Sequence, residues 1–257
     1  MIFLPGFKIL ACHHRGHGSH HHPHHGGGGG VVEKQAERRE IDVGRRVLDA
    51  NDQMAEANRR LFADQKVFVL NVMSSPGSGK TTTLVETIGR LQTLGIQCAV
   101  VVGDICTRND ADRLAATGVP AVQINTDQFG GDCHLTAQGI LKALDDIDLD
   151  RVDLLIVENV GNLVCPAEFD IGENARVVVL SVTEGEDKPL KYPLMFRQCD
   201  VALLNKTDLL PYLDFDATTA VANIHKVHSD IPVWPLSAKT GDGFEPWIEW
   251  IRTMVQH

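Results

Sequence analysis

The chain has 257 residues, is 43% hydrophobic and carries 24 Lys and Arg against 34 Asp and Glu, for a formal net charge of −10. This length fits one large domain or one domain with a tail, and the acidic balance argues against nucleic acid as a partner. No apolar run reaches the roughly 18 residues that a membrane-spanning helix takes, so none is expected.

The first ten residues are apolar, but they lack a basic leader and a small-residue cleavage site, which argues against a signal peptide. Six cysteines are too few for a disulfide framework in a chain of this length. They are expected to be thiols or metal ligands, in a cytoplasmic protein.

Residues 12–30 are rich in histidine and glycine, and they hold eight of the twelve histidines. With almost nothing apolar to bury, residues 1–32 are expected to form a flexible arm. Histidine-rich tracts are typical of metal binding. The candidate ligands for metal storage are His13, His14, His17, His20, His21, His22, His24 and His25. The alternative is a purification tag, but tags usually form one unbroken run, and other residues such as Arg15 and Pro23 interrupt this tract.

Residues 33–65 show apolar side chains at near-helical spacing among many charges, which predicts one or two helices, with Gly44 weakening the middle. From residue 66 to 257 the chain alternates between strand and helix patterns. The predicted strands are Val67–Met73, Gln97–Gly103, Ala121–Asn125, Asp153–Glu158, Val177–Val182, Val201–Asn205 and Val233–Leu236. The predicted helices are Thr81–Leu94, Ala111–Thr117, Leu135–Leu144, Ala217–Val227 and Phe244–Val255. This order predicts an α/β fold of the P-loop NTPase type, with a mostly parallel sheet covered by helices on both faces.

A phosphate-binding loop is predicted between the first strand and the first helix of this domain. The chain reads Ser-Ser-Pro-Gly-Ser-Gly-Lys-Thr-Thr from Ser74 to Thr82, in the strand–turn–helix context that such a loop requires. Ser74 stands where the usual pattern has Gly. Backbone N–H groups and the helix N-terminus would bind phosphates, Lys80 would reach the outer phosphates and Thr81 would bind Mg²⁺. The candidate phosphate-binding residues are Pro76, Gly77, Ser78, Gly79, Lys80, Thr81 and Thr82.

Two later loops resemble the guanine-binding loops of GTPases. Asn205-Lys206-Thr207-Asp208 follows a hydrophobic strand, and a carboxylate at Asp208 can accept hydrogen bonds from N1–H and the 2-amino group of guanine. The alternative is a strand-to-helix turn in which Asp208 is an N-cap. Ser237-Ala238-Lys239 follows a later strand, where the Ala238 amide would reach the base. Three such loops in this order predict that the nucleotide is GTP.

Carboxylates at two further strand ends are candidates for the catalytic centre. Glu158-Asn159-Val160-Gly161 stands where GTPases usually have Asp-x-x-Gly, so that Glu158 would hold Mg²⁺ and the Gly161 amide would sense the γ-phosphate. Asp104 would position Mg²⁺ or the attacking water, or it would serve only as a turn or cap residue. The candidate catalytic residues are therefore Lys80, Asp104, Glu158 and Gly161.

Cys133, His134 and Cys165 are candidate ligands for Ni²⁺ or Zn²⁺. Their spacing is not that of a zinc finger, and a free cysteine is more often a small buried hydrophobe. Cys98 is assigned that structural role, and so are Cys106 and Cys199. Cys165 shares a loop with Gly161, so a loop ordered by GTP and released on hydrolysis would move a metal ligand.

Taken together, these motifs resemble those of the hydrogenase nickel-incorporation GTPases, the accessory protein B family of [NiFe]-hydrogenase maturation. The matching segments are Met73–Thr81, Gly103–Asp104, Cys133–Leu135, Glu158–Pro166, Thr183–Pro193 and Asn205–Asp208. The resemblance implies a GTP-hydrolysing nickel metallochaperone that dimerises with nucleotide and has a metal site at Cys133, His134 and Cys165. It also implies two partners, the nickel chaperone accessory protein A and the hydrogenase large-subunit precursor.

The sequence departs from some members of that family, which carry a Cys-x-x-Cys-Gly-Cys nickel site near the N-terminus; here only Cys12 is present. The histidine-rich arm is similar to that of other members, in which imidazoles store nickel. Three alternatives stay open: a urease-type nickel GTPase, a nickel-storage protein with little GTPase activity and a P-loop kinase. The intact Lys80, Thr81 and Asp208 favour a GTPase, and Cys133-His134 with Cys165 favours the hydrogenase type.

Overall fold

The structure is a computed structural model that describes residues 29–104, 109–126 and 134–256, with side chains from residue 47. The chain divides into two compact units, Met1–Val43 and Gly44–His257. Residues 1–28 of the predicted arm, with all of its histidines, lie outside the described residues, whereas residues 29–32, predicted as the end of that arm, belong to a helix. Residues 33–65 were predicted to hold one or two helices, and the structure has a single helix there, α1 (Gly29–Gln65), which runs through Gly44 without a break.

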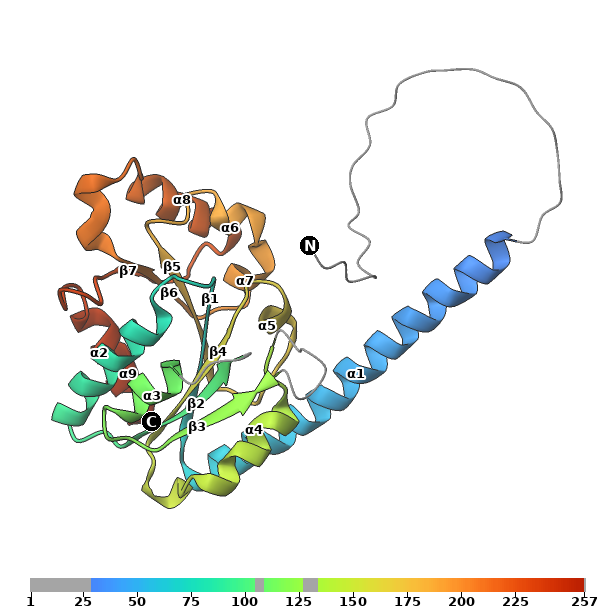
Figure 1. Ribbon diagram of the computed structural model, residues 1–257, viewed down its shortest axis with the longest axis horizontal. Helices are drawn as coiled ribbons and strands as arrows, with labels where there is room; N and C mark the ends of the chain where they lie inside the picture. Colours follow the sequence, from blue (N-terminus) through green and yellow to red (C-terminus); the bar gives the residue numbers. More distant parts are fainter. Residues whose placement is uncertain (1–28, 105–108, 127–133, 257) are drawn as a thin grey trace, which may run out of the picture. The chain divides into compact units, whose positions relative to one another are not determined.

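The second unit contains a sheet of seven strands, all of them parallel (Figure 1). Its order is β3-β2-β4-β1-β5-β6-β7. The strands are β1 (Phe68–Ser74), β2 (Cys98–Asp104), β3 (Ala121–Asn125), β4 (Leu154–Gly161), β5 (Ala175–Ser181), β6 (Val201–Asn205) and β7 (Val233–Pro235). Each predicted strand is present, with shifts of a few residues at the ends. The predicted α/β fold with a parallel sheet is confirmed.

Helices connect the strands. They are α2 (Lys80–Thr93), α3 (Asn109–Ala115), α4 (Ala137–Ala143), α5 (Cys165–Glu168), α6 (Lys188–Lys191), α7 (Pro193–Arg197), α8 (Ala217–Val227) and α9 (Glu245–Val255). The part of the chain that the structure describes also contains the 3-10 helices η2 (Leu144–Asp146), η3 (Leu149–Arg151) and η4 (Thr207–Tyr212). The five predicted helices correspond to α2, α3, α4, α8 and α9.

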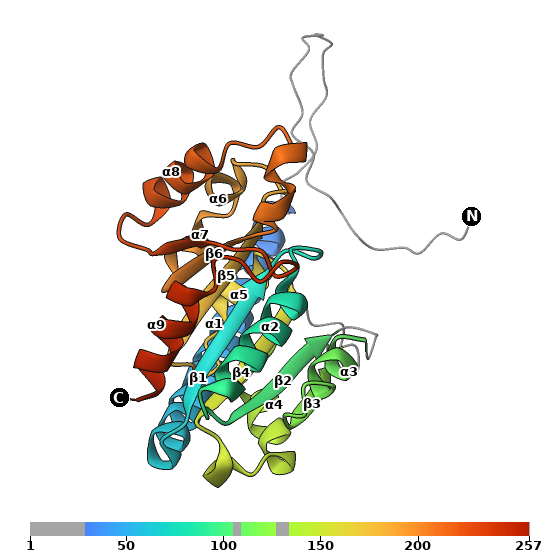
Figure 2. The same cartoon turned by 90° about the vertical axis from the view of Figure 1, so that its left-hand side faces the viewer.

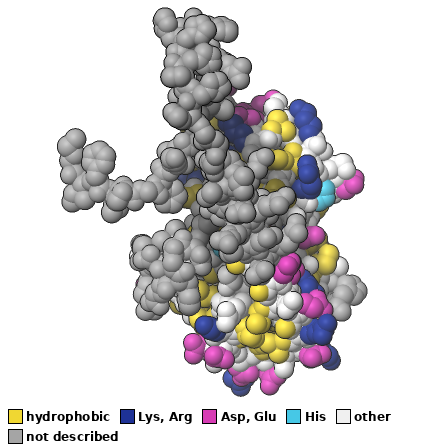
Figure 3. Space-filling view, turned by 90° about the vertical axis from the view of Figure 1, so that its right-hand side faces the viewer, with side chains coloured by type: hydrophobic (Ala, Val, Ile, Leu, Met, Phe, Trp, Pro, Cys, Tyr) yellow, Lys and Arg dark blue, Asp and Glu magenta, His cyan; other side chains and the backbone are white. Residues whose placement is uncertain are grey.

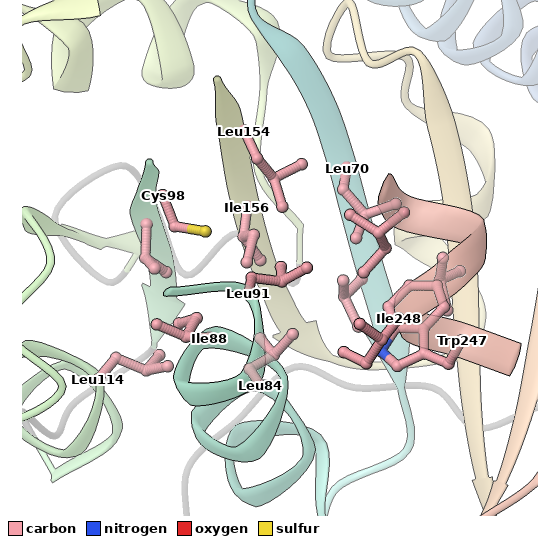
Figure 4. Close-up of a cluster of buried hydrophobic side chains, with 14 of the residues drawn as sticks. Leu70, Leu84, Ile88, Leu91, Cys98, Leu114, Leu154, Ile156, Trp247 and Ile248 are labelled. Carbon is pink, nitrogen blue, oxygen red and sulfur yellow. The ribbon is translucent and has the colours of Figure 1, made fainter. Parts of the chain in front are cut away.

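The sheet is buried on both faces, because successive side chains along its strands point alternately to the helices on one face and to those on the other. Leu70 and Val72 of β1 join a core with α2, α3 and α9, whereas Val69 points to a core with α4 and the end of α1. Figure 2 shows α2 and α9 in front of the sheet and α1 and α4 behind it. In Figure 4, Leu84, Ile88 and Leu91 of α2 meet the strand residues and Trp247 of α9. A third core packs β5 and β6 against α7 and α8.

The described surface carries charges of both signs. Figure 3 shows Lys and Arg side chains intermingled with Asp and Glu around a patch of hydrophobic side chains. Within the described ranges, none of the helices combines the length and apolarity needed to span a membrane.

Candidate functional site

The carboxyl ends of parallel strands lie at one edge of the sheet, where α/β proteins bind their ligands. Here this edge holds a cavity of about 570 Å³ lined by the whole loop from Ser74 to Thr82. Gly77 and Gly79 have φ of +77° and +92°, a conformation that L residues with side chains rarely adopt. The loop therefore turns its backbone toward the cavity just before α2 begins at Lys80.

Lys80 and Thr81 both contact Glu158 at the base of this cavity. The Thr81 hydroxyl donates to Glu158 Oε1 over 2.7 Å, and Lys80 Nζ lies 3.2 Å from the same oxygen. Lys80 Nζ also donates to the Asn159 carbonyl over 2.5 Å. The Glu158 side chain is only 2% exposed, so its charge requires the nearby ammonium.

The donor set at Glu158 fits a magnesium ion. Its second oxygen, Oε2, is buried and has no hydrogen-bond partner among the described residues. Carboxylate and hydroxyl oxygens are the ligands that Mg²⁺ prefers, and Glu158 and Thr81 present one of each. The Ser78 hydroxyl is likewise buried with no hydrogen-bond partner in the described ranges, which suits a phosphate oxygen.

Asn205 joins the phosphate loop to the two predicted base-binding loops. Its Nδ2 donates to the Ser78 carbonyl over 2.9 Å, and its Oδ1 accepts the Ala238 amide over 3.1 Å. Lys206 adds a second link, because its Nζ donates to the Gly77 carbonyl over 2.6 Å. The three loops therefore form one assembly at the edge of the sheet.

Asp208 lies in η4, half-buried, with its carboxylate held by Ser237. The Ser237 hydroxyl donates to Asp208 Oδ1 over 2.7 Å, while the backbone N–H of Thr240 donates to that hydroxyl over 3.2 Å. These bonds fix the direction of the carboxylate and leave Oδ2 and a second lone pair of Oδ1 for a ligand. Lys239 is exposed in the same turn.

Asp104 and Gly161, the other candidates for catalysis, also line the cavity. Asp104 ends β2, and Gly161 ends β4 beside Pro76, so closely that a Cβ at Gly161 would lie 3.2 Å from the Pro76 ring. Arg113 of α3 lines the cavity as well and donates to the Thr82 hydroxyl over 2.8 Å. The sequence did not indicate Arg113, because only the folding of α3 against α2 brings it there.

Two of the candidate metal ligands, His134 and Cys165, lie on segments that contact each other through Phe169. His134 stacks on the Phe169 ring, with the ring centroids 3.6 Å apart and an interplanar angle of 25°. Phe169 directly follows α5, which begins at Cys165. Cys165 is half-buried and disulfide-bonded in the structure, so a metal would require its reduced thiolate.

Cys133, Cys12 and Cys106 lie outside the described residues, as do the eight arm histidines. In the described ranges, no group of three or more Cys, His, Asp or Glu side chains is arranged to hold a metal. Cys98 and Cys199 are buried free thiols, which confirms the structural role predicted for them. Burial raises the pKa of Cys98 to about 12 and also raises that of Cys199.

Comparison with known proteins places this architecture in a defined group. The CobW/HypB/UreG nucleotide-binding domain family matches residues 68–235. The hydrogenase maturation factor HypB of Escherichia coli K12 is 52% identical over 218 residues, which cover 85% of this chain and 74% of that protein.

Two solved structures have the same fold at clear sequence identity. HypB from Helicobacter pylori in complex with nickel superposes with a TM-score of 0.75 at 37% identity, covering 80% of this chain and 95% of that one. The hydrogenase maturation factor HypB from Archaeoglobus fulgidus also gives a TM-score of 0.75, at 36% identity, covering 81% of this chain and all of that one (100%).

Proposed function

The chain belongs to the HypB family of hydrogenase maturation factors, within the CobW/HypB/UreG nucleotide-binding proteins, and we propose that it is a GTP-hydrolysing nickel metallochaperone. The observation that carries the proposal is the convergence of the phosphate loop, Glu158 and the Asn205–Asp208 loop at one cavity edge. A phosphate site with a base-selective loop is what a GTPase needs.

The selectivity for GTP rests on Asp208. Its Oδ2 and Oδ1 would accept the N1–H and 2-amino groups of guanine, and the Ser237 hydroxyl holds the carboxylate in place. Adenine lacks this pair of donors, and a site that leaves a polar group unpaired rejects such an analogue. The Ala238 amide donates to the Asn205 side chain, and this hydrogen bond joins the two base-binding loops.

Hydrolysis would depend on positioning and charge. Lys80 and the loop N–H groups would hold the phosphates, and Thr81 and Glu158 would hold Mg²⁺, which neutralises charge on the β- and γ-phosphates when bound. Asp104 would orient the attacking water, and the Gly161 amide would respond to the γ-phosphate. Arg113 is held by Thr82, so we expect slow turnover until a partner or a second copy completes the site.

Nickel is the cargo in this proposal. The arm histidines, from His13 to His25, would collect Ni²⁺, and Cys133, His134 and reduced Cys165 would receive it, with Zn²⁺ as a competitor. Release on hydrolysis would pass the metal onward. The nickel chaperone accessory protein A and the hydrogenase large-subunit precursor would be the partners, and the protein would act in the cytoplasm as a GTP-dependent homodimer.

A nickel titration tests the proposal. It compares the reduced full-length protein with a variant whose eight arm histidines are replaced by alanine, each with GDP and with a non-hydrolysable GTP analogue. We expect the variant to keep a nickel site whose affinity depends on the nucleotide. Lys80→Ala in the same background is the control that removes the nucleotide response. If all nickel binding disappeared with the arm histidines, the chain would be a GTPase with an attached nickel store.

A further inference from the structure

Two asparagines are buried in the central strands of the sheet. Asn71 of β1 is 0% exposed and Asn159 of β4 is 1% exposed. Burying an amide costs free energy unless its groups are hydrogen-bonded. Asn159 Nδ2 donates to Asn71 Oδ1 over 3.1 Å, so each side chain is stabilised by the other across neighbouring strands.

Asn159 contacts the nucleotide site through its backbone. Its carbonyl oxygen accepts Lys80 Nζ over 2.5 Å, and Asn159 directly follows Glu158. A phosphate bound in the cavity would draw the Lys80 ammonium toward itself. Occupation of the nucleotide site therefore acts directly on the segment that carries the Asn159 side chain.

One branch of this polar chain leads to His134. Asn159 Oδ1 accepts the backbone N–H of Leu135 over 3.3 Å as well as that of Val160 over 2.9 Å. Leu135 is buried and follows His134 directly. The segment that carries His134 is thus hydrogen-bonded to the side chain of Asn159.

The other branch leads to Cys165. Asn71 Nδ2 donates to Glu173 Oε1 over 3.1 Å, and Glu173 forms an ion pair with Arg176. Arg176 Nη1 donates to the Ala167 carbonyl over 3.2 Å, and its Nη2 donates to the Phe169 carbonyl over 3.5 Å. Ala167 belongs to the short helix that starts at Cys165, and Phe169 stacks on His134.

We propose that Asn71, Asn159, Glu173 and Arg176 are positioning residues that couple nucleotide binding at Lys80 to metal affinity at His134 and Cys165. The inference rests on the proposed function and adds to it a physical connection between the nucleotide site and the metal-ligand segments. Both segments with candidate metal ligands are attached to one buried chain, and that chain reaches the phosphate-binding lysine. Buried polar networks are cooperative, because a partly satisfied network costs more than a complete one.

Asn71 is the position at which to test the coupling, because it contacts neither the nucleotide cavity nor the metal-ligand segments. Asn71→Leu keeps the branched shape of the side chain and removes both hydrogen bonds. The matched control is Thr87→Val, since Thr87 is also 0% exposed and its hydroxyl bonds the Thr83 carbonyl and the Trp247 indole on the opposite face of the sheet. Thermal unfolding of both variants establishes that they are folded.

The readout is the sulfur-to-nickel charge-transfer absorption of the reduced full-length protein, which arm imidazoles do not produce. It is titrated with Ni²⁺ in the presence of GDP and of a non-hydrolysable GTP analogue, with Cys165→Ala identifying the band. Couplings between sites are typically about 5- to 150-fold in affinity. We expect Asn71→Leu to bind nickel and nucleotide but to reduce the ratio of the two nickel affinities to within about twofold, whereas Thr87→Val leaves the ratio unchanged.

The outcomes separate the coupling from the function on which it rests. A Cys165-dependent band whose nucleotide ratio survives in Asn71→Leu overturns the coupling alone. Absence of any Cys165-dependent band in the unaltered protein overturns the proposed metal site and the coupling with it. If Asn71→Leu does not fold, Arg176→Lys serves instead. A single ammonium cannot bond Glu173 and both carbonyls. Arg176→Lys should therefore lower the ratio of the nickel affinities measured with the two nucleotides, and an unchanged ratio would overturn the proposal.

Discussion

The Asn205 side chain donates to the Ser78 carbonyl over 2.9 Å and thereby ties the guanine-selective loop to the phosphate loop. The same side chain accepts the Ala238 amide, so one residue sets the spacing of all three loops. Gly79 lies against the Asn205 side chain. A Cβ added at Gly79 would lie 2.5 Å from Asn205 Nδ2, closer than real Cβ atoms approach a neighbour.

Gly79→Ala should therefore weaken nucleotide binding. The new methyl group meets Asn205, and φ of +92° is strained for alanine. Strain of this kind costs about 1–3 kcal/mol, so we expect affinity for GDP to fall by roughly tenfold or more, measured by calorimetry. Gly89→Ala is the control, because beyond the adjoining backbone of α2 a Cβ at Gly89 would meet no atom within 4 Å. Equal affinities for the two variants would contradict the prediction.

Asp208→Asn should change the base that the site selects. The amide can donate to the 2-oxo group of xanthine, whereas it repels the 2-amino group of guanine. Loss of a charged hydrogen-bonding partner should lower GTP affinity by about a hundredfold or more and raise the preference for xanthosine triphosphate. Competition binding with both nucleotides measures this. Asp214→Asn, six residues along and exposed, removes the same charge and should leave the preference unaltered.

Acid should remove a contribution to stability from Asp170. Burial alone would raise the pKa of this carboxyl, but hydrogen bonds from the Gly172 amide and Arg59 hold it below its usual value of 3.8. A lowered pKa in the folded state stabilises the protein above the unfolded value, and the contribution is lost as pH falls through the folded one.

Asp170→Asn should accordingly lower the melting temperature at pH 7. The pair is partly exposed, so its free-energy contribution is about 1 kcal/mol or less. Melting curves from pH 7 to about 3 should show the difference between the two proteins shrinking as Asp170 is protonated. Asp145→Asn, at an exposed position, is the control. A difference that grew toward low pH would show that the sign is wrong.

Cys98 and Cys199 should resist thiol reagents in the folded protein. Both are buried, and burial raises the pKa of each thiol, that of Cys98 to about 12, so hardly any reactive thiolate exists at pH 8. Native alkylation followed by peptide mass spectrometry should leave both unlabelled, and both should be labelled in guanidinium. Labelling of either at the rate of an exposed thiol would refute this.

The sequence was sufficient for the strands and for motifs that are contiguous in the chain. Apolar runs marked each strand. The phosphate-binding loop and the Asn205–Asp208 loop are recognised from residues that are contiguous in the chain. The short helices α5, α6 and α7 were missed because four or five residues are too few for a helical period. The predicted strand ending at Glu158 continues to Gly161, since Asn159 finds its partners inside the fold.

The polar chain beneath the site could not be predicted in the same way. Asn71, Asn159 and Glu173 are separated in sequence and meet only when β1 pairs with both β4 and β5. A polar residue inside the apolar run Val67–Met73 was the available signal. The sequence held no such signal for Arg113, because its contact with Thr82 depends on how α3 packs against α2.

The central place of β1 in the sheet also has a consequence for how the protein is made. Its two neighbours, β4 and β5, end at Gly161 and Ser181. A ribosome therefore synthesises the phosphate-loop strand long before either flanking strand exists to pair with it. We expect this apolar segment to remain unpaired until β4 has been synthesised, 87 residues beyond Ser74, which takes about 4–17 s at usual elongation rates of about 5–20 residues per second. The nascent chain is thus exposed to aggregation at the very strand that later carries the nucleotide loop.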